Sequence, residues 1–94
     1  MTYERRAEIY MQAIAKYGAE AQTRMAIEEM SELTKEICKL YRGEQNHNAL
    51  TDEIADVTIM MEQLRLVFGV NDEVEERVDY KARRLRDRMD CANE

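Results

Sequence analysis

Two acidic segments, 24 residues apart, carry the side chains of this chain that are best suited to chemistry. The first reads Glu-Glu-Met-Ser-Glu-Leu over residues 28–33, and the second reads Asp-Glu-Ile-Ala-Asp-Val over residues 52–57. On a helix, Glu29 lies about 40° from Leu33, and Glu53 holds the equivalent place in the second segment, so both acids border an apolar stripe. Two such helices packed face to face bring several carboxylates together, which is tolerable around a cation. Oxygen ligands suit a hard ion such as Mg²⁺ or Mn²⁺.

A solvated acidic face is the alternative interpretation, because twenty of the 94 residues are Asp or Glu. Surface acids on helices often have a Lys or Arg four residues later, as Glu73 and Asp79 have in Arg77 and Arg83. None of the six acids in the two segments has such a partner. Uncompensated like charges beside a core are destabilising, which favours the metal site.

Other catalytic chemistry has little support in the chain. His47 is the only histidine and falls in an expected loop, so the Glu-x-x-His pair of di-iron bundles is missing and His47 is expected to be exposed. No Ser/His/Asp or Cys/His nucleophile system can be assembled. There is also no Gly-rich phosphate-binding loop.

A basic segment near the C-terminus is the second chemical feature. Six of the fourteen Lys and Arg residues lie between Arg77 and Arg88. On a helix, Lys81, Arg84 and Arg88 share one face within about 60°. They either decorate a solvated helix or bind an anion, and the residues alone leave both interpretations open.

The hydrophobic pattern predicts an all-α chain folded as a compact up-down four-helix bundle. Pro is absent and Gly occurs only three times, which favours long helices. Gly18 should break the first helix from the second, and Gly43 should cap the second in a left-handed conformation. The expected helices run from Tyr3 to Tyr17, from Ala19 to Tyr41, from Asn48–Thr51 to Phe68, and from an N-cap at Asn71 to Met89, with residues 90–94 frayed.

Composition limits the classes of protein that remain. Residues 1–94 form one domain with little room for a core, so we expect an oligomer. The net charge of −6 argues against general nucleic-acid binding, and no apolar stretch is long enough to span a membrane. Cys38 and Cys91 match no disulfide framework, which indicates a reducing compartment. With no secretory signal after Met1, a cytoplasmic location is expected.

Together these motifs resemble the signature of the MazG-like all-α nucleoside triphosphate pyrophosphohydrolases, small phage-type members in particular. The likeness covers most of the chain. Glu28-Glu29-x-x-Glu32 is followed after twenty residues by Glu53-x-x-Asp56. Lys16-Tyr17-Gly18 and Gln22 precede the first motif, and Lys81, Arg84, Leu85 and Arg88 resemble the Lys-x-x-Arg-Leu-x-x-Arg run of the last helix.

The resemblance implies an enzyme that uses Mg²⁺ (Mn²⁺ is possible) and works as a homodimer or homotetramer. It also implies the roles of individual residues. The implied metal ligands are Glu29, Glu32, Glu53 and Asp56, with Glu28 as a supporting acid, and Lys81 and Arg84 are implied to hold phosphate oxygens. Glu28 and Glu29 are the candidate catalytic residues, since one of them would accept the proton of the attacking water. The remaining candidate substrate-binding residues are Tyr17, Gln22 and Arg88. Tyr17 also repeats the spacing of Tyr3 and Tyr10, which is more typical of core or interface than of base stacking.

The expected reaction is hydrolysis of an NTP or dNTP between its α- and β-phosphates, giving a nucleoside monophosphate and pyrophosphate. The choice of bond comes from the resemblance, because carboxylate spacing alone implies only a metal. A non-enzymatic helical oligomerisation module and a nucleotide-binding module are the alternatives. The sequence leaves open the base, the sugar, the number of metal ions, the general base and the choice between dimer and tetramer.

Overall fold

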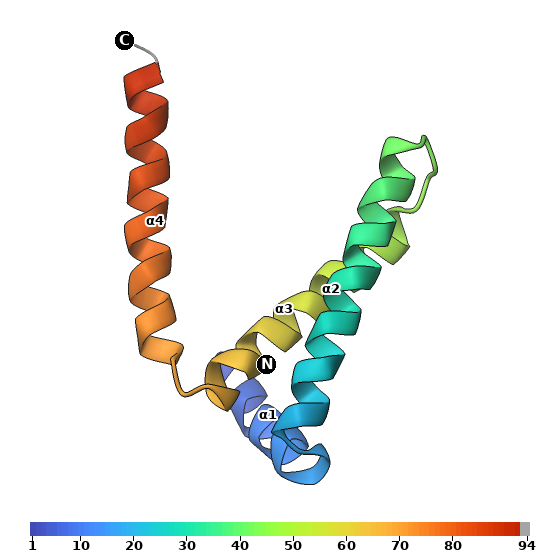
Figure 1. Cartoon of the computed structure of the whole chain (residues 1–94), viewed down its shortest axis with the longest axis vertical. Coiled ribbons are helices and arrows are strands. Elements are labelled where there is room, and N and C mark those ends of the chain that lie inside the picture. The colour runs from blue at the N-terminus through green and yellow to red at the C-terminus, as the bar shows by residue number, and fades with distance from the viewer. Residues whose placement is uncertain (93–94) are drawn as a thin grey trace.

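The chain folds into four α-helices in a computed structural model that describes residues 1–92 (Figure 1). This confirms the predicted all-α class and the number of helices, and residues 1–92 contain no strand. Four bounds differ from the prediction. The third helix begins at His47, which is exposed but helical, and it ends at Val67, one residue before Phe68. In the fourth helix, Asn71 is the first helical residue rather than the N-cap. This helix continues past Met89, so that residues 90–92 are helical rather than frayed, while residues 93–94 lie outside the described part of the chain. The helices are α1 (Tyr3–Tyr17), α2 (Ala19–Tyr41), α3 (His47–Val67) and α4 (Asn71–Ala92).

A capping hydroxyl begins α1, and a glycine in the left-handed conformation ends α2. The Thr2 side chain accepts a hydrogen bond from the Arg5 backbone N–H at the start of α1. Gly43 has φ +88°, and its N–H donates to the Leu40 carbonyl while the Glu44 N–H donates to the Lys39 carbonyl. These two bonds form a Schellman motif. The predicted glycine cap is confirmed, and it returns the chain from α2 toward α3.

Helices α2 and α3 form an antiparallel pair, and α1 packs against both of them (Figure 1). The link between α1 and α3 centres on Glu62, which accepts two hydrogen bonds from the Arg6 guanidinium and one of 2.6 Å from the Tyr10 hydroxyl. Burial would raise the pKa of Glu62, but the hydrogen bonds from Arg6 and Tyr10 outweigh it and hold this pKa below its usual value. The N-terminal helix is therefore held by a satisfied, charged cluster.

Helix α4 stands away from the other three, so the four helices of one chain do not pack as a single compact bundle (Figure 1). Its first turns make the described side-chain contacts with the rest of the chain. The Tyr3 hydroxyl donates to the Asn71 side chain, and Arg65 forms an ion pair with Glu75. Gly69, with φ +65°, turns the chain between α3 and α4. From that turn α4 and the α2–α3 pair diverge (Figure 1).

The core of the single chain is small. The apolar residues Tyr10, Ala26 and Met60 are buried, but no side chain is completely enclosed in the described part of the chain. Helical periodicity places Met30, Ile37, Ile54 and Phe68 on apolar stripes and so predicts that they point inward, but they are 40–61% exposed. The prediction is wrong for these residues within one chain, in which α4 stands away from the other helices.

Among the helices of residues 1–92, none combines the length and the hydrophobicity needed to span a bilayer.

The Glu62 cluster predicts a measurable contribution to stability. Tyr10→Phe removes a hydrogen bond to a charged acceptor and should lower the free energy of unfolding by about 1–3 kcal/mol. Tyr41→Phe is the matched control, because Tyr41 is 87% exposed, and it should leave the stability unchanged. Urea denaturation followed by circular dichroism measures both. Equal stability of the two variants would contradict the assigned role of Glu62.

Candidate metal centre

Two polar contacts hold α2 and α3 in register on either side of the acidic segments. Near one end, the Gln22 amide donates to the Gln63 side chain at 2.7 Å, and both residues are buried. Near the other end, the Asn46 amide donates to the backbone carbonyl and the side chain of Glu36, at 2.8 and 2.7 Å. Since buried amides need partners, these contacts favour one alignment of the two helices. The alignment places the acids of the two segments opposite each other.

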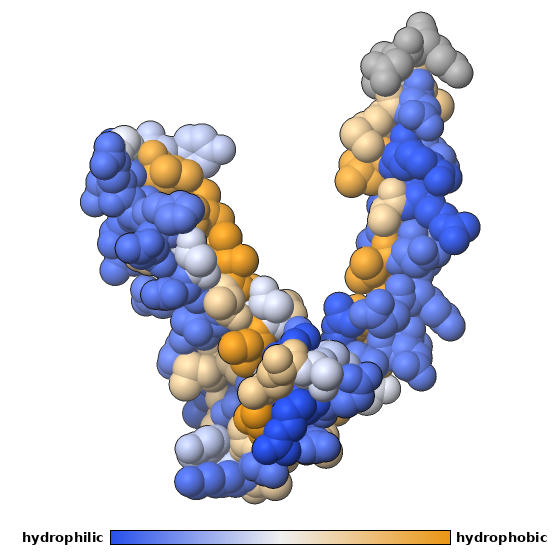
Figure 2. Space-filling model, turned by 180° about the vertical axis from the view of Figure 1, so that it is seen from behind, coloured by the Kyte–Doolittle hydropathy of each residue, from blue (hydrophilic) through white to orange (hydrophobic). Residues whose placement is uncertain are grey.

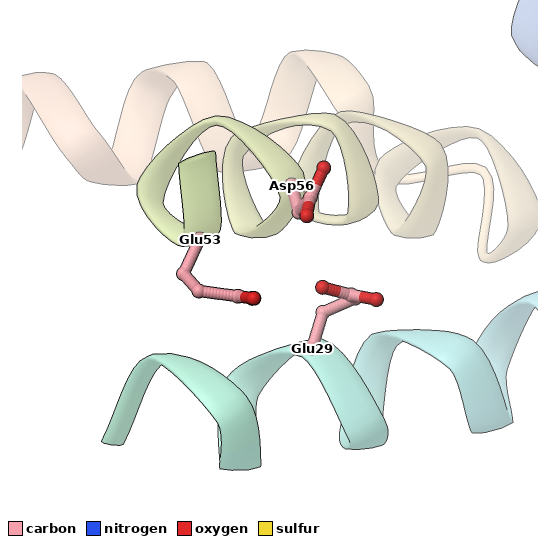
Figure 3. A group of neighbouring side chains, drawn as sticks. All are labelled: Glu29, Glu53 and Asp56. Carbon is pink, nitrogen blue, oxygen red and sulfur yellow. The ribbon is translucent and has the colours of Figure 1, made fainter. Parts of the chain in front are cut away.

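Three of the predicted ligands meet between the two helices: Glu29 from α2, and Glu53 and Asp56 from α3 (Figure 3). One carboxylate oxygen from each lies within 4.8 Å of those of the other two. Glu29 and Glu53 are half-buried, whereas Asp56 is exposed. The three side chains converge, so the predicted juxtaposition of the two acidic segments is found.

The acidic trio Glu29, Glu53 and Asp56 has no cationic partner in the part of the chain that the structure describes. The Oε2 atom of Glu53 is buried and has no hydrogen-bond partner. A buried carboxylate oxygen without a donor is costly, because it loses its water and gains nothing in return. This atom also lies beside two further carboxylates. A cation bound here would offset both the lost hydrogen bond and the repulsion among the three negative charges.

Burial and neighbouring charge act together on Glu29. Burial, together with the adjacent carboxylates of Glu53 and Asp56, raises the pKa of Glu29 from an ordinary 4.5 to about 6. The shift has the direction expected when like charges share a site. A bound cation would reverse it, because a positive charge favours the ionised form.

The trio fits a small divalent ion in chemistry and in size. All ligand atoms are carboxylate oxygens, the type that Mg²⁺ and Mn²⁺ prefer. Around an octahedral Mg²⁺, with bonds of about 2.1 Å, ligand oxygens are about 3.0 Å apart when adjacent and about 4.2 Å apart when opposite. The three oxygens of the trio lie within 4.8 Å of one another, which is close to this range.

The structure leaves two predicted acids outside the trio. Glu32 and Glu28 are both on α2 and exposed, and neither belongs to the group of converging oxygens. Glu32 lies one turn beyond Glu29. The single chain therefore assembles three of the four implied ligands, and the roles of Glu32 and Glu28 stay predictions.

The basic residues Lys81, Arg84 and Arg88 lie on α4, and all three are exposed. Since α4 meets the rest of the chain near its own start, these residues are not brought to the trio within one chain. Arg83 pairs with Asp79 at 3.1 Å, as its spacing predicts.

Tyr17 and Gln22 line one pocket of about 460 Å³, together with Ala21, Met25, Met60 and Gln63. Gln22 precedes Glu29 by seven residues, which places it on the same face of α2 at a distance of about 10 Å along the axis. Gln63 was missed by sequence reasoning, although it follows Asp56 by the same interval. The other inter-helix contact follows the same seven-residue spacing. Glu36 lies seven residues after Glu29, and Asn46 lies seven residues before Glu53.

Comparisons of the chain with protein-family models, with curated proteins and with solved structures each gave no match. The resemblance to the MazG-like enzymes therefore rests on the motifs in the sequence.

The raised pKa of Glu29 predicts how stability depends on pH when metal is absent. An acid whose pKa is higher in the folded state adds stability that is complete below pH 4.5 and is lost as the pH rises through about 6. In EDTA, the melting temperature of the wild type should therefore fall relative to that of Glu29→Gln across this interval.

Glu28→Gln is the control, because Glu28 is exposed and lies outside the trio, and it should keep the wild-type profile. A difference between wild type and Glu29→Gln that stays constant from pH 4 to 7 would contradict the clustering of the three carboxylates.

Proposed function

We propose that this protein is a Mg²⁺-dependent nucleoside triphosphate pyrophosphohydrolase, which cleaves an NTP or dNTP to a nucleoside monophosphate and pyrophosphate. The observation that carries the proposal is the acidic trio, in which a buried oxygen of Glu53 has no partner and no basic side chain of residues 1–92 pairs with the carboxylates. The bond that is cleaved comes from the resemblance of the two acidic motifs and the basic run to the MazG-like enzymes.

The divalent ion would be held by Glu29, Glu53 and Asp56, with Glu32 as the fourth ligand that the resemblance implies. When bound, such an ion supplies charge neutralisation on the phosphates and lowers the pKa of water. It also reverses the local electrostatic potential, so that a chain with net charge −6 can accept an anionic substrate at this point.

Proton transfer falls to the first acidic segment. Attack of water on the α-phosphorus releases a proton, and a carboxylate within reach of that water must accept it. Glu29 and Glu28 are the candidates.

The remaining residues would bind the substrate. Lys81, Arg84 and Arg88 would contact phosphate oxygens and offset the charge that develops on the leaving pyrophosphate. The pocket at Tyr17 and Gln22 lies on the same face of α2 as Glu29, and its apolar wall and buried amide suit a nucleoside. Self-association as a homodimer or homotetramer belongs to the same proposal.

Turnover of a triphosphate panel, measured as pyrophosphate release with Mg²⁺, tests the proposal directly. Glu53→Gln and Asp56→Asn should lose nearly all activity, because the site then lacks a ligand. Lys81→Ala and Arg84→Ala should each lose about 10²–10³-fold, the usual cost of removing one group that stabilises developing charge.

Arg83→Ala is the control for the basic helix. Arg83 lies about 200° around α4 from Lys81 and pairs with Asp79, so its loss should leave turnover nearly unchanged. Wild-type turnover by Glu53→Gln, or equal losses in Arg83→Ala and Lys81→Ala, would contradict the proposed roles. Absence of pyrophosphate release from every triphosphate would favour a non-enzymatic module.

A further inference from the structure

Asn46 stands at the N-cap position of α3 but does not cap the helix. Its side chain makes no hydrogen bond to the first turn of α3, and its backbone has φ −124° and ψ 37°. Thr2, at the start of α1, shows the usual arrangement: its backbone is extended, with ψ 164°, and its side chain accepts a hydrogen bond from the Arg5 N–H. At Asn46, a residue type that is well suited to capping is therefore used for another purpose.

The side chain of Asn46 reaches across to α2 instead. Its amide nitrogen donates to the Glu36 backbone carbonyl at 2.8 Å and to the Glu36 carboxylate at 2.7 Å. Glu36 is buried, and Lys39 donates to the other oxygen of its carboxylate at 3.1 Å. The hydrogen bonds from Asn46 and then from Lys39 hold the pKa of Glu36 below its usual value. The Asn46 amide is therefore bound by a charged acceptor, which makes a strong contact.

This orientation leaves the side-chain oxygen of Asn46 without a partner. Among residues 1–92, the buried side-chain atoms that lack a hydrogen bond are Oδ1 of Asn46 and Oε2 of Glu53. The two residues are seven apart, so they lie on the same side of α3, about 10 Å from each other along its axis. Both face α2, where Glu36 and Glu29 are their counterparts (Figure 3). The unsatisfied atoms thus belong to one row of α3, and that row contains the metal centre.

The arrangement at Asn46 lowers stability in two ways. Helix α3 lacks a side-chain capping bond, and a buried amide oxygen loses its water without gaining a donor. Departures of this kind from the usual rules are commonest at functional sites, where the fold must hold a group in one place. We therefore looked for what the contact between Asn46 and Glu36 holds in place.

Alignment of Glu53 is what this contact provides. Of the two side-chain contacts that join α2 to α3 in the described residues, the one at Asn46 is nearer to Glu53, at seven residues along the chain, whereas Gln63 is ten residues away. Successive residues of a helix point in directions 100° apart, so turning α3 by a fraction of that angle at its start swings Glu53 away from Glu29.

We propose that Asn46 is a positioning residue of the metal centre, which fixes the start of α3 against Glu36 so that Glu53 faces Glu29, at the expense of capping α3. Asn46 contacts neither the ion nor the substrate and acts through Glu53. This role rests on one part of the proposed function, the binding of a divalent ion by the acidic trio. It does not depend on the substrate or on the bond that is cleaved.

Asn46→Ser separates alignment from stability. Serine is a favoured N-cap residue, but its side chain is too short to reach Glu36. Binding of Mn²⁺, followed by the loss of the EPR signal of the free ion, should weaken by about 10–100-fold, the usual effect of removing a group that orients metal ligands. The melting temperature in EDTA should stay close to that of the wild type, because a capping bond offsets the lost contact with Glu36.

Two further variants serve as controls. Asn48→Ser makes the same change at an exposed neighbouring asparagine and should match the wild type in Mn²⁺ affinity and in melting temperature. Glu36→Gln removes the negative charge but keeps a side-chain oxygen and the backbone carbonyl as acceptors for Asn46, so it should retain the affinity for Mn²⁺.

Wild-type Mn²⁺ affinity in Asn46→Ser would overturn the positioning role. Equal weakening in Glu36→Gln would also overturn it, as would a large fall in the melting temperature of Asn46→Ser in EDTA, which is the behaviour of a purely structural residue. A wild type that binds no Mn²⁺ would overturn both the metal centre and the role of Asn46. If Asn46→Ser weakens Mn²⁺ binding as expected but the wild type releases no pyrophosphate, the positioning role is supported and the proposed function alone is contradicted.

Discussion

Repulsion among three carboxylates is the main physical constraint on the pairing of α2 with α3. Glu29, Glu53 and Asp56 come from two helices and converge without a basic side chain among the described residues to offset them. Solvated acids relieve such repulsion by turning away into water. Here the helix pairing holds Glu29 and Glu53 half-buried, and burial raises the pKa of Glu29. A cation at this point would convert the most unfavourable feature of the fold into a stabilising one.

The rest of the α2–α3 pair is arranged so that the carboxylates cannot separate easily. The Gln22–Gln63 contact and the Asn46–Glu36 contact stand on either side of the trio, and a shift of one helix along the other would break both. This polar face leaves little apolar area for a core between the two helices. A stripe of apolar surface consequently lies on the side of the pair that faces α4 across the open space (Figure 2).

The sequence was sufficient for the helices and for the pairing of Glu29 with Glu53, because both follow from local periodicity and from a short loop between neighbouring helices. It could not show that α4 would diverge, since the same apolar stripe serves packing within a chain and packing between chains. Gln63 was also missed. Its contact with Gln22 depends on the register of two helices, which the periodicity of either one leaves undetermined.

Isothermal titration calorimetry with Mg²⁺ is the most direct test of the central claim, that the trio binds a divalent ion. A saturable isotherm is expected for the wild type and for Asp52→Asn, which changes a neighbouring exposed acid outside the trio. Glu53→Gln should show no binding, because its buried oxygen is the ligand that most needs a cation. Wild type that binds no Mg²⁺ at millimolar concentration, or Glu53→Gln that binds it as well as the wild type, would contradict the account.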